Sequence, residues 1–439
     1  MVVLIFRTLK IEYQKGETTM THPKMKWTYI GVDSHKETHC AVFLDCFFGK
    51  IGEITFNNIP SEFEAFLKEA KKHKVGGTDF AFGLEDTSAY GKSLAMFLAD
   101  KKQMVKHVNA ALVANERNSH NVLHKTDSFD AECAARVLLS RFDELPIANP
   151  QDKYWVLAEI VTRRNSLIKI NVGLKNYLHT LLSGNYPNYK KYFRLVASKT
   201  ALAFFENYPS PDTLKGVTAE ELRETIKRNS GGSFGIAMAT VLLKHVEKCG
   251  CKPSEYQAEK CFTVKSVVRQ VKANLFEIEE TEKLLESFLK NFDYKLTSIR
   301  GVDTVMAARL IAEIGDIQRF STPAKLAKYA GVAPVTYASG KTDIQYANTR
   351  GNRQLNETLF RLALTMVMVT GRSRKIRNPY FYDYYRKKLS EGKTKRQALK
   401  CVERRLVNIL WGMMKNKTEY RNPPSYDEPK EKEDKEQKA

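Results

Sequence analysis

Short apolar runs and helical repeats alternate over the N-terminal part of the chain. The runs "WTYIGVD", "THCAVFLD" and "GKIGEITFNN" succeed one another between residues 27 and 57 and predict three paired strands. Two more strand-like runs, "TDFAFGLED" and "QMVKHVN", alternate with helical spacing in "SEFEAFLKEAKKH", "YGKSLAMFLADKK" and "DSFDAECAARVLLSRF". Strands that alternate with amphipathic helices predict an α/β domain over residues 27–150.

The pattern becomes helical over residues 151–295. Two long repeats, over residues 153–193 and 262–293, predict an antiparallel, coiled-coil-like pair of helices. The second repeat contains no Pro or Gly that would break it. The polar stretch between them, residues 194–255, has turns at "NYPSPD" and "NSGGS" and predicts an inserted helical lobe.

A third, mainly helical domain is predicted over residues 296–415. Its first part, "SIRGVDTVMAARLIAEIGDIQRF", is a short helix bounded by glycines, which is typical of elements that present backbone amides to phosphates. A helix, a loop or hairpin and a helix that begins after Gly351 follow. Residues 416–439 are charged and predict a disordered tail, and residues 1–26 predict an extension in which Met20 or Met25 could be the natural start.

Charge and cysteine content narrow the class of protein. A chain of 439 residues predicts two or three domains. The surplus of 71 Lys and Arg over 50 Asp and Glu gives a net charge of +21, which favours a polyanionic partner such as nucleic acid. A basic protein without such a partner is the alternative. Scattered cysteines and the lack of a long apolar run indicate a cytosolic protein rather than a disulfide-rich or membrane protein.

Acidic residues stand where predicted elements of the first domain begin or end. Asp33 ends the first strand, Glu85 ends the strand "FAFGLE", and Asp127 and Asp130 lie three apart at the start of a helix, on one face. In an RNase H-like domain, such residues meet in one crevice. Four carboxylates repel one another, and divalent cations that prefer oxygen ligands, such as a Mg²⁺ pair about 3.5–4 Å apart, offset the repulsion. Four unrelated surface acids are the alternative.

Ser339 is a candidate nucleophile in "GVAPVTYASGKTDIQYANTRGN". A serine that attacks a phosphodiester requires exposure, room for the phosphate and donors for the developing charge. Gly340 supplies room, and Lys341 and Arg350 supply charge. A Ser-Gly turn with no chemical role is the alternative.

Other polar residues allow weaker hypotheses. His35 and His39 flank Asp33 and could assist it or be incidental. Arg163 and Lys175 lie on the first long helix, where they could contact a nucleic-acid backbone or face solvent. A zinc site is a further hypothesis for His245, Cys249, Cys251 and Cys261, whose Cys-x-Cys spacing differs from the usual Cys-x-x-Cys.

Several motifs occur in one order over residues 28–415: "IGVDSHKETHCAVFLD", "GLED", "KTDSFDAECAARVL", "GLKNYLHTLL", "SIRGVDTVMAARLIAEIGDIQRF", "LAKYAGVAPVTYASGK" and "NTRGNRQL". This ordered set resembles the IS110-family transposases, which include the IS1111 group. The resemblance implies three parts: an α/β RNase H-like (RuvC-like) DEDD domain, a long helical coiled-coil region, and a mainly α C-terminal transposase domain that carries a nucleophilic serine.

The resemblance also implies roles for residues. Ser339 becomes the nucleophile of a covalent DNA intermediate, and the tetrad of Asp33, Glu85, Asp127 and Asp130 binds Mg²⁺, with Mn²⁺ as the alternative. Carboxylates and serine would form a composite site between subunits of a homotetramer, a dimer of dimers. The implied partners are donor and target DNA and a bridge RNA encoded by the element, in a bacterial or archaeal nucleoid.

Nucleic-acid contacts are expected at Lys341, Arg350, Arg353, Lys175 and Arg163. The chain departs from the family pattern at Asn356, where an Arg is usual, so that a phosphate contact would move to Arg353 or Arg361.

Two other functions remain open from the sequence. A Holliday-junction-type nuclease would use the same carboxylates with water, and Ser339→Ala would leave its strand cleavage intact. A non-catalytic nucleic-acid-binding protein would be indifferent to Asp127→Ala. A transposase that cuts and rejoins DNA strands is sensitive to both substitutions.

Overall fold

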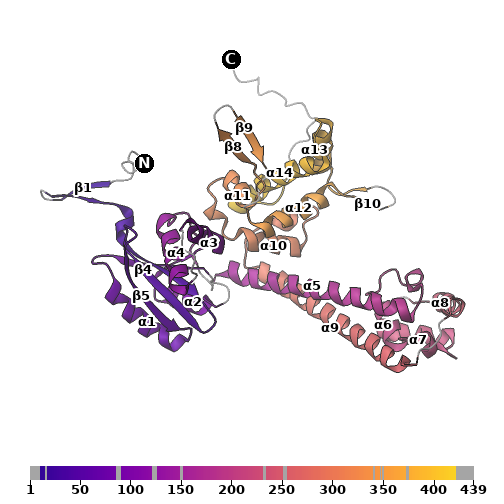
Figure 1. The fold of residues 1–439 in the computed structure, drawn as a ribbon. Coiled ribbons are helices and arrows are strands. Elements are labelled where there is room, and N and C mark those ends of the chain that lie inside the picture. Colours follow the sequence, from indigo (N-terminus) through magenta and orange to yellow (C-terminus); the bar gives the residue numbers. More distant parts are fainter. Residues whose placement is uncertain are drawn as a thin grey trace, which may run out of the picture. The chain divides into compact units, whose positions relative to one another are not determined.

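The computed structural model describes residues 10–14, 17–85, 90–120, 126–148, 152–230, 234–250, 255–339, 342–346, 348, 351–371 and 375–421 (Figure 1). The chain forms two compact units, which divide between residues 156 and 157. Among the described residues, no helix has both the length and the apolar character needed to cross a membrane.

A five-stranded mixed sheet forms the centre of the first unit. The central strand β3 is antiparallel to β4 and parallel to β6, and the strand order is β5-β4-β3-β6-β7. The outer strand β5 is antiparallel to β4, and β7 is parallel to β6. All five predicted strands are present: β3 (Trp27–Ser34), β4 (Thr38–Leu44), β5 (Lys50–Asn57), β6 (Asp79–Leu84) and β7 (Met104–His107).

Helices cover both faces of this sheet, as expected for an α/β domain. One face packs against α1 (Phe63–Ala70) and α2 (Lys92–Asp100) through a core that includes Ile30, Val32 and Phe82. The other face packs against α4 (Asp127–Ser140) and α3 (Ala110–Ser119) through a core that includes Tyr29 and Ala81. Successive residues of a strand therefore alternate between the two cores.

Two glycines allow α4 to approach the sheet closely. A Cβ atom on Gly31 of β3 would lie 2.1 Å from the carbonyl oxygen of Ala131 and 2.2 Å from the backbone nitrogen of Ala135. A Cβ atom on Gly83 of β6 would lie 3.2 Å from the Cβ atom of Leu138 in α4 and 2.9 Å from Val108 Cγ2. Any side chain at Gly31 would thus displace the helix that carries Asp127 and Asp130.

Helix α3 was not predicted. Asn109 caps it, because its Oδ1 atom accepts from the backbone nitrogen of Ala111 over 2.8 Å. Before the sheet, the hairpin of β1 (Lys10–Gln14) and β2 (Glu17–Thr21) leads to η2 (Pro23–Lys26). Two short 3-10 turns complete the unit, η3 (Pro60–Glu62) and η4 (Lys71–His73).

The two predicted long helices are α5 (Lys153–Asn185) and α9 (Gln257–Leu289), which lie side by side in Figure 1. Arg164 Nε of α5 donates to Glu282 Oε1 of α9 over 2.8 Å, and Asn274 Nδ2 donates to the Leu167 carbonyl over 3.0 Å. Later residues of α5 thus meet earlier residues of α9, so the pair is antiparallel, as predicted.

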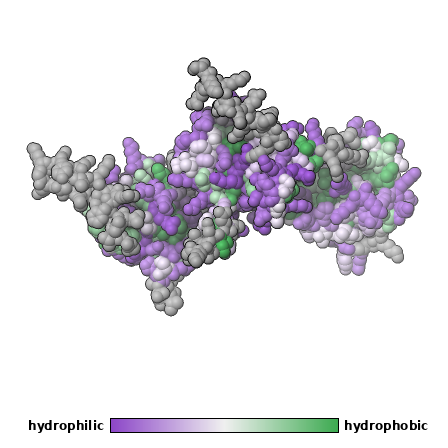
Figure 2. All heavy atoms as spheres, turned by 90° about the horizontal axis from the view of Figure 1, so that it is seen from above, coloured by the Kyte–Doolittle hydropathy of each residue, from purple (hydrophilic) through white to green (hydrophobic). Residues whose placement is uncertain are grey.

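A helical lobe connects the two long helices, as the sequence predicted. Its aromatic core contains Phe204, Phe205 and Tyr186 and continues onto Leu178 of α5 and Val267 of α9. Figure 2 shows hydrophobic side chains among hydrophilic ones at the lobe. The lobe consists of η5 (Tyr189–Lys191), α6 (Lys199–Asn207), η6 (Pro211–Leu214), α7 (Ala219–Ser230) and α8 (Ile236–Cys249).

The remainder of the second unit is mainly helical. Trp411 Nε1 donates to the Phe320 carbonyl over 2.9 Å, and Lys417 Nζ lies 2.7 Å from Asp293 Oδ2. Its elements are η7 (Leu296–Ser298), α10 (Thr304–Ile314), η8 (Ile317–Arg319), α11 (Pro323–Tyr329), β8 (Val335–Ser339), β9 (Thr342–Tyr346), α12 (Arg353–Val367), β10 (Val369–Thr370), β11 (Lys375–Ile376), α13 (Pro379–Ser390) and α14 (Lys395–Asn416). Residues 422–439, most of the predicted tail, lie outside the described residues.

Candidate functional site

The alternation of side chains along β3 and β6 brings Asp33 and Glu85 to the same side of the sheet. Asp33 follows Gly31 by two residues, and Glu85 follows Gly83 by two, so both lie on the face that packs against α4. The strands are parallel neighbours, with Val32 opposite Leu84. Both carboxylates line a cavity of about 350 Å³, together with Asp130, Arg117 and residues of α3.

The first turn of α4 supplies two further carboxylates. Thr126 caps this helix, since its Oγ1 atom accepts from the Phe129 backbone nitrogen over 3.2 Å, so neither aspartate is its N-cap. Asp130 is 5% exposed and lines the cavity. The Asp127 side chain is 61% exposed and is not among the residues that line it. The i, i+3 spacing therefore places the two carboxylates on one turn but at different depths.

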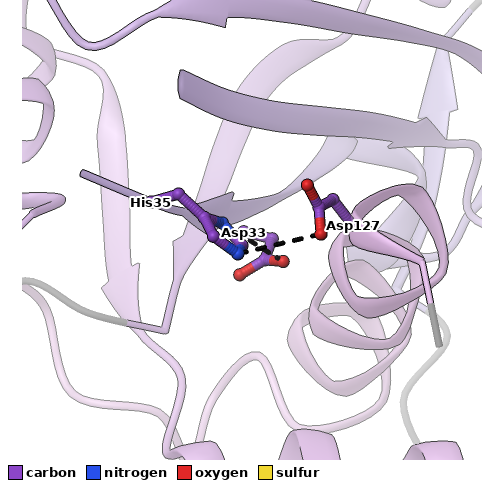
Figure 3. Close-up of side chains that lie close together, drawn as sticks. All are labelled: Asp33, His35 and Asp127. Atoms are coloured by element: carbon purple, nitrogen blue, oxygen red, sulfur yellow. Dashed lines mark ion pairs between the residues drawn. The ribbon is translucent and has the colours of Figure 1, made fainter. Parts of the chain in front are cut away.

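His35 connects Asp127 to the cavity. Its Nδ1 atom lies 3.7 Å from Asp33 Oδ2, and its Nε2 atom lies 3.7 Å from Asp127 Oδ1 (Figure 3). One potential ligand atom from each of the three side chains lies within 4.8 Å of the others. The oxygen-rich donor set fits a hard divalent cation such as Mg²⁺, which favours carboxylate ligands. Among the described residues, this is the group whose donor atoms converge closely enough to hold a metal ion, and Glu85 and Asp130 line the cavity beside it without belonging to the group.

Arg117 is a member of the cavity that the sequence did not predict. Its Nη1 atom donates to Asp130 Oδ1 over 2.6 Å. This hydrogen bond and the negative charge of Asp130 raise the pKa of the Arg117 guanidinium. A positive charge therefore lies among the carboxylates that line the cavity. The Asn109 cap was the one local signal for its helix.

The two histidines that flank Asp33 occupy different environments. His39 is 1% exposed and packs between Phe56 and Phe63 in the core. Burial lowers the pKa of its imidazole, so the neutral form is favoured. His39 is therefore a core residue, whereas His35 lies among the acidic groups.

Ser339 is the last residue of β8, and its backbone pairs with Thr342 of β9. The hairpin agrees with the loop or hairpin predicted there. The side chain of Ser339 lies outside the described part of the structure, as do Lys341 and Arg350. Arg353 begins α12 and is exposed.

The base of this hairpin is closed by backbone contacts. Gly331 has a φ of +66°, and a Cβ atom on Gly351 would lie 2.3 Å from the Gly331 backbone nitrogen. The Asn352 backbone nitrogen donates to the Tyr329 carbonyl over 2.7 Å. Asn356 Nδ2 donates to the Ala330 carbonyl over 2.8 Å. The residue that departs from the family pattern thus binds the protein backbone.

A half-buried carboxylate supports the same base. Asn352 caps α12 through its Oδ1 atom, which accepts from the Leu355 backbone nitrogen over 2.8 Å. Its Nδ2 atom lies 3.0 Å from both Glu313 Oε2 and the Tyr329 hydroxyl. Burial raises the pKa of Glu313, while the Asn352 hydrogen bond opposes that shift. One amide therefore links α10, α11 and α12 beneath the hairpin.

The expected contacts on α5 remain predictions. Arg163 is exposed and Lys175 is half-buried. Near the suggested zinc ligands, Cys249 Sγ lies 3.4 Å from His245 Nε2. Cys251 is outside the described residues.

Comparisons with known proteins place the chain among transposases. A DEDD transposase model of the IS110 type matches residues 30–187, and the model of the transposase IS116/IS110/IS902 family matches residues 293–385. The uncharacterized 44.8 kDa protein of insertion element IS116 from Streptomyces clavuligerus is 26% identical over 400 residues, which is 89% of this chain and 95% of that protein.

Two further relatives align over almost their whole length. The uncharacterized 42 kDa protein of insertion element IS900 from Mycobacterium paratuberculosis is 23% identical, over 89% of this chain and 96% of that protein. A pilin gene-inverting protein from Moraxella lacunata is 27% identical, over 89% of this chain and 97% of that protein.

Proposed function

Because the chain belongs to the IS110 family of transposases, an enzyme family that acts on DNA, we propose that it cuts and rejoins DNA strands through a covalent phosphoserine. Ser339 is the proposed nucleophile. The proposed metal ligands are Asp33, Glu85, Asp127 and Asp130. One observation carries the proposal: carboxylates from two central strands and a helix line or adjoin one cavity.

The sheet supports an RNase H-like (RuvC-like) assignment of the first domain. Three antiparallel strands are followed by two parallel ones, in the order β5-β4-β3-β6-β7. In this arrangement Asp33 and Glu85 lie at the C-terminal ends of two neighbouring parallel strands. The assignment gives the four carboxylates a shared role in place of four separate surface positions.

The proposed chemistry divides between the carboxylates and the serine. Mg²⁺ held by the carboxylates, or Mn²⁺ in its place, would polarise the scissile phosphate and offset its developing charge. The Ser339 hydroxyl loses its proton and forms a bond to phosphorus, and the displaced DNA oxygen leaves as a hydroxyl. Attack by a hydroxyl of another strand reverses the exchange, restores the serine and joins the new strand. The phosphoserine ester conserves the bond energy, so ATP is not needed.

Nucleic-acid guidance and assembly are part of the proposal. The family resemblance supports a bridge RNA that pairs with donor and target DNA, and a homotetramer in which serine and carboxylates come from different subunits. The net charge of +21 fits both polyanions. Sequencing of RNA that co-purifies with the chain tests guidance, and a discrete RNA encoded beside the gene is expected. Absence of any enriched RNA would contradict it.

Covalent capture tests the serine mechanism. The chain, with its co-purified RNA, is incubated with Mg²⁺ and labelled DNA that contains the ends of its element, and the products are separated on a denaturing gel. Wild type is expected to form a protein–DNA adduct, and Ser339→Ala to form none. Ser321→Ala, an exposed serine of the same unit, is the matched control. Strand cleavage that persists in Ser339→Ala would favour the hydrolytic nuclease instead.

A further inference from the structure

Helix α3 brings one positive charge to the acidic cavity. Ala110, Val113 and Ala114 line the cavity with small side chains, and Arg117 extends into it from the last turn of the helix. The Arg117 side chain is 30% exposed, and its Nη1 atom lies 2.6 Å from Asp130 Oδ1. The guanidinium of Arg117 thus contacts Asp130, one of the proposed metal ligands, directly.

Asp130 is buried, so its hydrogen bond with Arg117 affects both its stability and its orientation. Asp130 is 5% exposed, and a buried carboxylate is costly unless it is paired and hydrogen-bonded. A guanidinium is planar and directs its donors along fixed lines, so it holds a carboxylate oxygen in one orientation. The hydrogen bond therefore fixes the rotation of the Asp130 carboxylate relative to the cavity.

Arg117 also interacts electrostatically with Glu85, which lines the same cavity. Its charge lowers the mutual repulsion of the carboxylates before a cation binds. A carboxylate offers about four lone-pair positions, so a hydrogen bond to one oxygen is compatible with metal coordination by the same group.

We propose that Arg117 is a positioning residue, which holds the Asp130 carboxylate in the orientation that divalent-cation binding in this cavity requires. The inference rests on the proposed function, because it assumes that the carboxylates bind a metal. A competing role predicts the opposite result. An arginine that merely competes with the cation for Asp130 would weaken metal binding, and its removal would strengthen it.

Titration with Mn²⁺ distinguishes the two roles. Bound and free Mn²⁺ are measured by electron paramagnetic resonance on the full chain, and Asp33→Asn defines the binding that belongs to the cavity. Arg117→Ala is expected to weaken this binding about tenfold or more, as is typical when a group that orients a ligand is lost. Arg117→Lys is expected to fall between Arg117→Ala and wild type, since it keeps the charge without the planar geometry.

The matched control is Arg136→Ala. Arg136 belongs to α4 and pairs with Glu132, 2.7 Å from Nη2 to Oε1, but does not line the cavity. This variant loses an ion pair of the same kind and is expected to bind Mn²⁺ like wild type. Thermal unfolding without Mn²⁺ tests whether Arg117→Ala and Arg136→Ala are folded. Arg117→Lys covers the case in which the alanine variant does not fold.

A double-mutant cycle shows whether Arg117 acts through Asp130. In an Asp130→Asn background, Arg117→Ala is expected to cause no further loss of Mn²⁺ affinity. A full second loss there, or unchanged or tighter binding in the Arg117 variants, would overturn the positioning role and leave the proposed function intact. If wild type shows no Asp33-dependent Mn²⁺ binding, both the metal part of the proposed function and this inference fail.

Discussion

The proposed metal ligands and the proposed nucleophile are held by different means. Asp33 and Glu85 leave strands that are covered on both faces, so buried cores determine where their side chains point. In the hairpin that carries Ser339, the side chains that the structure describes are exposed, for example Val335 at 47% and Tyr346 at 55%. Its position depends on contacts at its base, between Gly331 and Gly351 and around Asn352.

This difference predicts different mechanical behaviour. Elements with many buried apolar contacts open rarely, whereas exposed hairpins belong to the less stable parts of a protein. We therefore expect the carboxylates to be preorganised and the serine hairpin to adjust when DNA binds. Substitutions at the two glycine contacts test this contrast most directly.

Gly31→Ala should have the largest effect. The new Cβ atom would meet the α4 backbone at 2.1 Å, and overpacking of a core costs about 1–3 kcal/mol, here at the upper end because backbone atoms must move. Chemical denaturation should show this loss, and Mn²⁺ binding and covalent capture should both disappear. Gly76→Ala is the control, since nothing lies within 4 Å of its Cβ position. Wild-type metal binding in Gly31→Ala would show that the helix contact does not position the carboxylates.

Gly351→Ala should separate the two regions. Its Cβ atom would lie 2.3 Å from the Gly331 backbone nitrogen and would force the base of the hairpin apart. A displacement of about 1 Å at a reacting group can cost about 100-fold in rate, so we expect a drop of that order in adduct formation. Mn²⁺ binding should not change. Gly412→Ala on α14, with an open Cβ position, is the matched control. Loss of metal binding in Gly351→Ala would contradict the separation.

The same contrast explains how far the sequence could be interpreted. Asp33 and Glu85 stand where apolar strand-like runs end, which is a local pattern, so the sequence predicted that they would meet in one crevice. The i, i+3 spacing predicted one turn for Asp127 and Asp130. It could not predict that one would be buried and the other exposed, because that depends on how α4 packs.

Helix α3 and Arg117 were beyond local patterns. The apolar residues of α3 do not recur at helical spacing, and the partner of Arg117 is thirteen residues away on another helix. The hairpin base was missed for the same reason, since Gly331 and Gly351 meet only when the hairpin has formed. Glycine letters alone do not show which backbones touch.

Asn352→Ala should have a smaller effect than either glycine substitution. Loss of an N-cap costs about 0.5–2 kcal/mol, and the link to Glu313 is lost with it. Adduct formation should therefore fall, by less than in Gly351→Ala. Thr394→Ala removes the N-cap of α14, so it should cost similar stability without reducing the adduct. Equal adduct formation in Asn352→Ala and Thr394→Ala would show that Asn352 acts only by stabilising its helix.

The smallest expected effect is the pH dependence of local stability, which should have opposite signs in the sheet and at the base of the hairpin. Burial lowers the folded-state pKa of His39. The contribution of His39 to folding stability is therefore complete above its unfolded-state pKa of about 6.5 and is lost as the pH falls. Burial raises the folded-state pKa of Glu313. The contribution of Glu313 to folding stability is therefore present below its unfolded-state pKa of about 4.5 and is lost as the pH rises. Between these values, acid should destabilise the sheet around His39 and stabilise the base of the hairpin.

Hydrogen exchange of peptides from β3–β4 and from α10–α12, corrected for intrinsic rates, measures both slopes in one sample. His39→Leu should remove the acid sensitivity of the β3–β4 peptides and leave the other slope unchanged, and Glu313→Gln should do the reverse. His35→Ala is the control for the sheet, because His35 is half exposed among the carboxylates rather than packed in the core. If His35→Ala instead of His39→Leu removed the slope, the acid response would arise at the carboxylates. The two regions would then differ in chemistry, and not only in how their elements are packed.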